Sequence, residues 1–482
     1  MSAEQARLAD GRVVEFVRVP DPPDGTMKVT FFAPDKSYVV QFFKDSATAS
    51  DPYRLKRLEA ILGKYNPTSA GTPSAQYLKD LFCWPTGIVV KPELGIVAPA
   101  YPSHFLFGSG DLKGKEKKGN WFSSPKLRRR IIERMRVEAA ELGTWINYFQ
   151  ICIRMARAVR KLHQSGLAHS DLSTNNVLVD PTQGRVAVID IDSLVVPGIF
   201  PADVLGTRGY IAPEVLRTSR LGLNDPNRRH PGVSTDQHAL PVLIYESLLH
   251  RHPLIGPKIH APDSDEDDHL ALGERALYIE HLSDKSNRPR DLAIPATALG
   301  PELAELFRRA FVDGLPHPGL RPSAFEWERA LVKTWDLLIP CSNARCPNQW
   351  FVVADRTNVG CPFCGTRVRG RTLPLLRLRM ERRPGTWVND GLLAVYHQKA
   401  VFQWHAVSGV FPDENVGDRR MQAYFAMHEG RWLLVNQSLN GLTSPGGTRL
   451  APGQALELKD GASFRLSSEP NGRMADVELV QT

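Results

Sequence analysis

Long hydrophobic runs are missing from this sequence of 482 residues. No run of about 18 uncharged apolar residues occurs, so we expect no membrane-spanning helix and no membrane partner. The N-terminus, MSAEQARLADGR, is polar and lacks the apolar core that a secretory signal carries. Secretion is therefore not expected, and the cytoplasm is the predicted location.

A strong excess of one charge is also missing. The chain has 60 basic and 52 acidic residues, a formal net charge of +8. Basic residues are concentrated only between Asp111 and Arg136, and they are not interleaved with aromatic residues in the pattern that favours nucleic-acid binding. This segment is either a solvated loop and helix face or a docking surface for an acidic partner. We expect no nucleic-acid ligand.

Cysteine is scarce, but it is clustered. Four of the six cysteines lie close together in the sequence: Cys341, Cys346, Cys361 and Cys364. In a chain without a secretion signal, such a cluster is more typical of metal ligands than of disulfides. Four thiolates suit a closed tetrahedral site, so we predict a structural Zn²⁺ in a zinc ribbon at residues 339–370. The isolated Cys83 and Cys152 are expected to be core thiols.

The stretch from Leu167 to Asp192 places four polar residues on loops that flank two short apolar strands: His169, Asp171, Asn176 and Asp190. Phosphoryl transfer from a nucleotide needs one carboxylate to orient the attacking hydroxyl and accept its proton. It also needs an amide and a second carboxylate to hold Mg²⁺ on the phosphates. This order resembles the catalytic loop and the magnesium loop of protein kinases.

The resemblance to protein kinases implies a role for each of these residues, with ATP as the phosphate donor. Asp171 is the implied catalytic base. Asn176 and Asp190 are the implied Mg²⁺ ligands, which also makes them part of the nucleotide site. His169 is implied to be a structural anchor that packs and forms hydrogen bonds under the catalytic loop.

Three positions depart from the kinase pattern. Ser170 replaces an arginine that reads a phosphorylated activation loop, which argues against activation by that route. Ser173 replaces a lysine that contacts the transferred phosphate, which predicts slower chemistry because one cation is missing from the transition state. Asp192 replaces the glycine of the D-F-G sequence, and the sign of its effect stays open.

The N-terminal residues read as three strands and a helix, in this order: 13–19, 27–32, 38–43 and a helix from residue 52. The order resembles the small lobe of a protein kinase. There, a strand lysine contacts the nucleotide phosphates and pairs with a glutamate of the helix. The resemblance implies Lys44 and Glu59 for these two roles.

The segment between the first two of these strands departs from the kinase pattern. A glycine-rich loop is expected there, whereas Val19–Gly25 reads VPDPPDG. Prolines cannot donate N–H groups to phosphate, and aspartates repel it. Downstream, Pro99 and Tyr101 fall where the resemblance places the hinge, with the Pro99 carbonyl and the Tyr101 N–H as the implied adenine contacts.

Gly206 to Glu214 reads GTRGYIAPE, which resembles the end of the activation segment in Ser/Thr protein kinases. Small-molecule kinases usually lack it. The resemblance implies structural roles for four residues: Thr207, Glu214, Asp236 and Arg321. No Ser, Thr or Tyr lies between Ser193 and Gly206, so activation-loop phosphorylation is not expected. The acidic run from Asp263 to Asp268 is expected to be a mobile loop.

Residues 371–482 alternate short Val/Leu/Phe-rich runs with turns, which predicts an all-β sandwich. Ser438-x-Asn440-Gly441 and the run from Leu456 to Leu466 resemble a forkhead-associated domain, a family that binds phosphothreonine peptides. The expected phosphate-binding motif is degenerate, because Arg419–Ala423 has arginine and glutamine in place of serine and histidine. A sandwich that docks proteins or braces the kinase lobes is the alternative.

The predicted fold class is α+β: a bilobal protein-kinase-like fold followed by a four-cysteine zinc ribbon and a β-sandwich. The predicted segments are the small lobe, the large lobe, the ribbon and the sandwich: 1–102, 103–338, 339–370 and 371–482. The combination resembles bacterial kinases of tellurite-resistance-associated systems, which accompany a von Willebrand A-domain protein and a PP2C-type phosphatase. An active Ser/Thr protein kinase is predicted. A pseudokinase scaffold and a small-molecule kinase are the alternatives.

Overall fold

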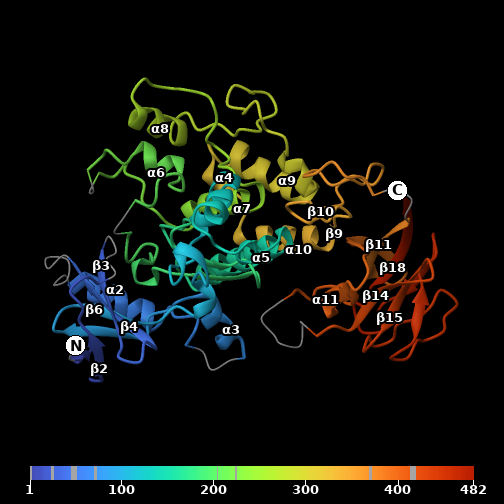
Figure 1. The fold of residues 1–482 in the computed structure, drawn as a ribbon, viewed down its shortest axis with the longest axis horizontal. Coiled ribbons are helices and arrows are strands. Elements are labelled where there is room, and N and C mark those ends of the chain that lie inside the picture. Colours follow the sequence, from blue (N-terminus) through green and yellow to red (C-terminus); the bar gives the residue numbers. More distant parts are fainter. Residues whose placement is uncertain are drawn as a thin grey trace. The chain divides into compact units, whose positions relative to one another are not determined.

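The computed structural model describes most of the chain, in eight stretches: 3–22, 27–44, 52–69, 73–202, 205–222, 225–368, 372–412 and 420–482. The chain divides into two compact units (Figure 1). Unit 1 comprises Met1–Gly143, Gln150–Asp291 and Phe307–Glu328. Unit 2 comprises Thr144–Phe149, Leu292–Leu306 and Arg329–Thr482. No helix in the described stretches is long and apolar enough to cross a membrane.

Unit 1 begins with a six-stranded sheet in the order β2-β1-β5-β6-β4-β3, drawn in blue in Figure 1. Its strands are β1 Ala3–Leu8, β2 Val13–Val17, β3 Lys28–Phe32, β4 Tyr38–Phe43, β5 Gly87–Lys91 and β6 Gly95–Pro99. Two helices separate β4 from β5: α2 Pro52–Leu62 and α3 Pro73–Leu81. The predicted strands after residues 13, 27 and 38 are present. β1 was not predicted, because its sequence, AEQARL, has no β-branched or aromatic residue.

The added strand changes the pairing expected at the start of the chain. The kinase resemblance implies that the first two predicted strands, now β2 and β3, form a hairpin across the loop Val19–Gly25. Instead β2 pairs with β1, and β2 and β3 stand at opposite ends of the strand order. The connection therefore does not turn back as a hairpin, and part of it, residues 23–26, lies outside the described stretches.

Strand alternation gives this sheet two different faces. On one face, the rings of Phe16, Phe31 and Phe42 pack together, with centroids 5.3–6.0 Å apart. On the other face, Phe43 shares an apolar cluster with Leu58 of α2. The direction of a side chain on β3 or β4 therefore decides whether it reaches the aromatic cluster or the side that carries α2.

The helices that follow are α4 Pro125–Glu133, α5 Trp145–Gln164, α6 Pro213–Arg217, α7 Val233–Leu249, α8 Ser264–Leu272, α9 Pro301–Arg308 and α10 Ala324–Asp336. A two-stranded hairpin, β7 Val177–Asp180 with β8 Arg185–Val188, lies between α5 and α6. The prediction of a mobile loop at the acidic run is wrong, since α8 begins there. The carboxylate of Asp263 accepts N–H groups of Asp265 and Glu266, and acidic side chains are stabilised in the first turn of a helix.

Unit 2 contains the cysteine-rich segment, built on a short hairpin of β9 Leu338–Pro340 and β10 Trp350–Val352. Two antiparallel four-stranded sheets follow. The strands of the first are β11 Thr372–Arg383, β12 Thr386–Ala394, β17 Ser463–Arg465 and β18 Met474–Gln481. The second contains β13 Ala400–Val401, β14 Ala423–His428, β15 Arg431–Asn436 and β16 Ala455–Glu457, with α11 Gln403–Ala406 after β13. Both sheets supply side chains to one apolar cluster, including Leu376, Phe425 and Phe464.

Candidate active site and four-cysteine cluster

The β7–β8 hairpin brings two of the predicted site residues together. Val177 at the start of β7 is paired with Val188 at the end of β8, and the next residues outward are Asn176 and Ile189. The N–H of Ile189 donates to the carbonyl of Asn176 at 3.0 Å. Asp190 follows directly, with φ 63° and ψ 39°. A short local hairpin therefore brings the backbone of Asn176 next to that of Ile189, the residue before Asp190.

Asp171, the predicted base, is held by contacts from two directions. The Asn176 Nδ2 atom donates to the Asp171 carbonyl at 2.8 Å and to its Oδ2 at 3.0 Å. The N–H and the hydroxyl of Thr207 donate to Oδ1 at 2.6 and 2.7 Å. Asn176, next to the β7–β8 hairpin, and Thr207, in the GTRGYIAPE segment, thus both orient this carboxylate.

Asp236, near the start of α7, holds the loop that carries His169 and Asp171 through backbone hydrogen bonds. Its carboxylate accepts the N–H groups of His169 at 2.7 Å and Ser170 at 3.0 Å. It also lies 3.1 Å from Nε2 of His163, and its side chain is only 1% exposed. The His169 ring lies 2.9 Å from the Ile189 carbonyl and so connects the loop to the β7–β8 hairpin.

We expect Asp236→Ala to lower the stability of unit 1. The substitution leaves two buried N–H groups without an acceptor, and each such group costs about 1–3 kcal/mol. The check is the urea midpoint of the full chain, with Asp284→Ala as control, since Asp284 is exposed and its carboxylate only accepts from Ser286 in a turn and pairs with Lys258 on the surface at 3.6 Å among the described residues. Equal midpoint shifts in the two variants would contradict the anchoring role.

A lysine that the sequence reasoning did not select lies among the acidic residues. Lys28 of β3 places its Nζ 2.9 Å from Asp190 Oδ1 and 2.5 Å from Asp192 Oδ1. Burial by itself lowers the pKa of Lys28, but the two carboxylates outweigh it, and the net pKa is raised. Burial likewise raises the pKa of Asp190, yet the ammonium outweighs it and lowers that pKa. Lys28 is therefore charged and Asp190 ionised at neutral pH.

The two residues that the resemblance implies for the lysine–glutamate pair, Lys44 and Glu59, are both exposed in the structure. Lys44 directly follows β4, and its side chain is exposed. Glu59 lies on an exposed side of α2. The side chain brought to Asp190 is that of Lys28. Only long-range pairing could have signalled it, since Lys28 and Asp190 are 162 positions apart.

The predicted hinge residues lie at the end of β6. Pro99 is the last residue of that strand and pairs with Tyr38 of β4. The Tyr101 ring packs against an apolar cluster that contains Ile189 and Leu178. This places the residue that precedes Asp190 next to the predicted hinge. Burial raises the pKa of the Tyr101 hydroxyl well above its usual value, so this group stays neutral.

Glu214 and Arg321 form a two-pronged ion pair. The Arg321 Nη1 and Nη2 atoms lie 2.7 Å from Glu214 Oε1 and Oε2, respectively. The arginine also donates to the carbonyls of Ser234 at 2.8 Å and Gly314 at 2.8 Å. Its side chain is 1% exposed, against 12% for the glutamate. The pair ties α6 to the start of α7 and to the segment before α10.

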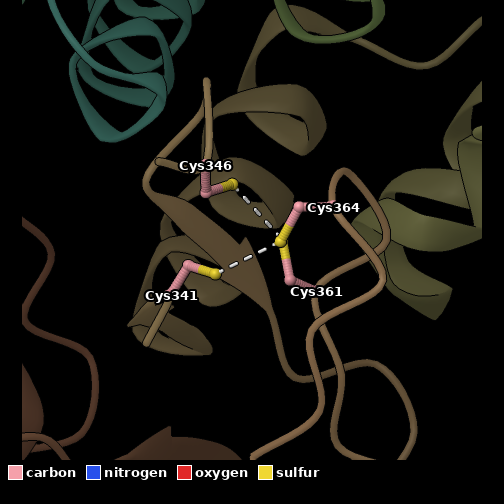
Figure 2. Close-up of side chains that lie close together, drawn as sticks. All are labelled: Cys341, Cys346, Cys361 and Cys364. Atoms are coloured by element: carbon pink, nitrogen blue, oxygen red, sulfur yellow. Dashed lines mark hydrogen bonds between the residues drawn. The ribbon is translucent and has the colours of Figure 1, made fainter. Parts of the chain in front are cut away.

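The four clustered cysteines converge in unit 2, and their sulfur atoms face one another (Figure 2). All four Sγ atoms lie within 4.8 Å of one another. Cys341 and Cys364 have sulfurs 3.6 Å apart, and Cys346 and Cys361 have sulfurs 3.7 Å apart. Zn–S bonds of about 2.3 Å in a tetrahedron put sulfurs roughly 3.8 Å apart. The donor set and its spacing therefore fit a zinc ion.

The residues that resemble a forkhead-associated domain lie in strands of both sheets of unit 2 and in loops next to them. Asn440 accepts a hydrogen bond from Arg449 at 2.9 Å. Gly441 has φ +81°, and a Cβ there would meet the Ser468 side chain at 2.1 Å, so glycine is required. In the predicted phosphate motif, Arg420 is exposed, whereas Arg419 lies outside the described stretches.

Comparison with known proteins agrees with this geometry. Residues 126–305 match the protein kinase domain family. This part of the chain is similar to protein kinase domains. The match includes Asp171, Asn176 and Asp190, whereas Lys28 and Lys44 lie before it. The match barely enters unit 2.

The curated relatives that the chain matches are kinases. The chain is 29% identical over 219 residues to atypical protein kinase C from Drosophila melanogaster, covering 42% of this chain and 30% of the relative. It is 35% identical over 97 residues to the serine/threonine-protein kinase WNG2 from Toxoplasma gondii, covering 20% and 17%, respectively. The chain thus spans less than a third of the length of these relatives.

Among solved structures, the chain is similar to ROP2 from Toxoplasma gondii, a protein described as a virulence factor with a protein-kinase fold and no enzymatic activity. The TM-score is 0.44 at 14% identity, over 69% of this chain and 85% of that one. It is also similar to the kinase PK-1 of the Cydia pomonella granulovirus, with a TM-score of 0.39 at 18% identity, over 66% and 92% of the two chains.

Proposed function

We propose that this protein is a Ser/Thr protein kinase that transfers the γ-phosphate of ATP to hydroxyl groups of proteins. The observation that carries the proposal is the cluster of Asp171, Asn176 and Asp190. One carboxylate is oriented by Thr207, and an amide and a second carboxylate are set beside it by a hairpin. A GTRGYIAPE segment in contact with the base supports a protein substrate rather than a small molecule.

In the proposed reaction, the Asp171 carboxylate orients the substrate hydroxyl and accepts its proton. The hydroxyl oxygen forms a bond to the γ-phosphorus. The bond between that phosphorus and the bridging oxygen breaks, and its electron pair stays on ADP. Asn176 and Asp190 supply the oxygen ligands that suit Mg²⁺. When bound, this ion neutralises charge on the phosphates.

The test is transfer of labelled γ-phosphate to the protein itself or to casein. We expect Asp171→Asn, which keeps the shape of the side chain, to lose about 10²- to 10⁴-fold in rate, as is usual when a general base is removed. Asp225→Asn is the matched control, because Asp225 only caps an exposed turn at Asn227. If the wild type and Asp171→Asn are equally inactive, the proposed kinase activity is refuted.

A pseudokinase scaffold is the second candidate, and one contact favours it. Asp190, the proposed Mg²⁺ ligand, already has an ion pair with Lys28. A scaffold that binds nucleotide would show a thermal shift with Mg–ADP but no phosphate transfer. The same labelled-ATP experiment therefore separates the two functions.

We further propose that activity does not depend on activation-loop phosphorylation. The segment after Ser193 has no hydroxyl residue before Thr207, and α2 already contacts it. The Tyr53 hydroxyl donates to the Ile199 carbonyl at 2.8 Å, and Arg57 donates to the Pro201 carbonyl at 2.9 Å. Phosphatase treatment of the purified protein is expected to leave its rate unchanged.

For unit 2, we propose a zinc ribbon at residues 339–370 and a β-sandwich at 371–482 that resembles a forkhead-associated domain. Its partners would be a von Willebrand A-domain protein and a PP2C-type phosphatase, as in the bacterial tellurite-resistance-associated systems. These assignments rest on the sequence resemblance, supported by the converging thiols and the two sheets that share a core. Adding the purified candidate partners to the labelled-ATP assay tests whether they alter the rate.

A further inference from the structure

Lys28 lies on the face of the small-lobe sheet that carries α2. It is paired across the strands with Phe43, and directly paired residues point to the same face of a sheet. Phe43 belongs to the apolar cluster shared with Leu58 of α2. Lys44 is the next residue after Phe43, so strand alternation directs it to the opposite face. The backbone therefore favours Lys28 over Lys44 for a role on the side of α2.

The Lys28 side chain is also placed at the catalytic acids. Its Nζ contacts Asp190 at 2.9 Å and Asp192 at 2.5 Å, and the side chain is 12% exposed. Asp192 is 5% exposed and Asp190 is 35% exposed. The ammonium thus has one deeply buried partner and one partner that still reaches solvent, where a ligand can enter.

Helix α2 provides no acidic partner for a phosphate-binding lysine. Its one acidic residue, Glu59, is on an exposed position, whereas Arg54 and Arg57 are buried at 8% and 2% exposure. Arg57 is engaged with the Pro201 carbonyl. A buried lysine needs a compensating anion. Asp190 and Asp192 are the carboxylates in contact with Lys28, and Asp192 is the more deeply buried of the two.

We propose that Lys28 binds the phosphates of the nucleotide and that Asp192 positions it, in place of a lysine on β4 and a glutamate on α2. This inference rests on the proposed kinase function and deepens it. When nucleotide binds, Lys28 exchanges its contact with Asp190 for phosphate oxygens, while its bond to Asp192 keeps it in the site. A lysine serves as a point charge for phosphate. The proposal thereby gives a role to Asp192, which stands where the kinase pattern has glycine.

The first test compares Lys28→Met with Lys44→Met, the rival assignment, in two measurements on the full chain. One is labelled-phosphate transfer, and the other is the thermal shift produced by Mg–ADP, which needs no turnover. We expect Lys28→Met to lower the transfer rate by about 10²- to 10³-fold, the usual effect of losing one charge-stabilising group, and to abolish the shift. Lys56→Met, an exposed lysine on α2, is the control and should match the wild type.

A second set of variants separates nucleotide binding from folding. Lys28→Met leaves Asp192 buried without its partner, so the double variant Lys28→Met/Asp192→Asn removes both charges of the pair. We expect the double variant to melt close to the wild type without nucleotide and yet remain inactive. Asp192→Asn alone is expected to raise KM for ATP, and Asp192→Glu to restore most of it, a rescue that a purely structural role would not require.

Some outcomes overturn the inference and leave the kinase intact. These are an active wild type in which Lys44→Met loses more activity than Lys28→Met, or a double variant with wild-type activity. A wild type that binds nucleotide but transfers no phosphate refutes only the proposed kinase activity. The thermal-shift measurement then still tests whether Lys28 binds the nucleotide. A wild type that neither binds Mg–ADP nor transfers phosphate overturns both.

Discussion

Replacing Cys361 by serine is expected to reduce bound zinc from one atom per chain to nearly none and to unfold the cysteine-bearing part of unit 2. Cys346 and Cys361 are both 2% exposed and belong to a small apolar cluster with Ile339 and Phe351. Such a cluster is too small to hold its loops without a crosslink. Structural zinc contributes about 10–16 kcal/mol in zinc-finger peptides at neutral pH. The free energy lost with the ion therefore exceeds the free energy of unfolding of a domain of ordinary size.

The measurement is metal content by mass spectrometry, together with thermal unfolding before and after chelation. Cys83→Ser is the matched control. Cys83 is a partly buried thiol in unit 1, where desolvation raises its pKa to about 12, so it is not a thiolate ligand. The control should keep one zinc per chain. A metal-free wild type, or a Cys361→Ser variant that retains a full equivalent, would contradict the zinc ribbon.

Arg321→Met is expected to destabilise unit 1 by about 3–5 kcal/mol, the usual effect of breaking a buried ion pair and leaving one charge unpaired. Both guanidinium prongs bind Glu214 at 2.7 Å. The glutamate is the second residue of α6 and ends the GTRGYIAPE segment, so its carboxylate would stay in place without a counter-charge. Because the same segment contacts Asp171 through Thr207, the loss should also lower the transfer rate.

Urea unfolding of the full chain checks this expectation. A double variant separates the effect of the charge pair from that of packing. Arg321→Met/Glu214→Gln removes both charges and is expected to recover a large part of the lost stability. Arg12→Ala removes an arginine from an exposed pair with Asp10, in which the side chains are 61% and 50% exposed, and should have a far smaller effect. A double variant as unstable as Arg321→Met would show that packing, not the charge pair, is responsible.

Much of the candidate active site could be predicted because its residues are close in sequence. Asp171 and Asn176 are five positions apart, and a single hairpin then returns the chain to Asp190. The acidic run at α8 shows the opposite case. Its charges suggested a loop, although the first carboxylate of the run, that of Asp263, caps a helix and the next three acidic residues lie in the first turn of that helix. Composition did not distinguish these states, because the same charges suit both solvent and a helix N-terminus.

The sequence by itself determined which residues are proposed to carry chemistry: Asp171, Asn176 and Asp190 by their order around two short strands, and the four thiols by their spacing. Only the tertiary structure decided which lysine joins them. Lys28 reaches Asp190 across 162 positions, because β3 pairs with β4 in a register that turns Lys28 toward α2 and Lys44 away. A shift of one residue in that register would exchange the two faces, and no local pattern encodes it.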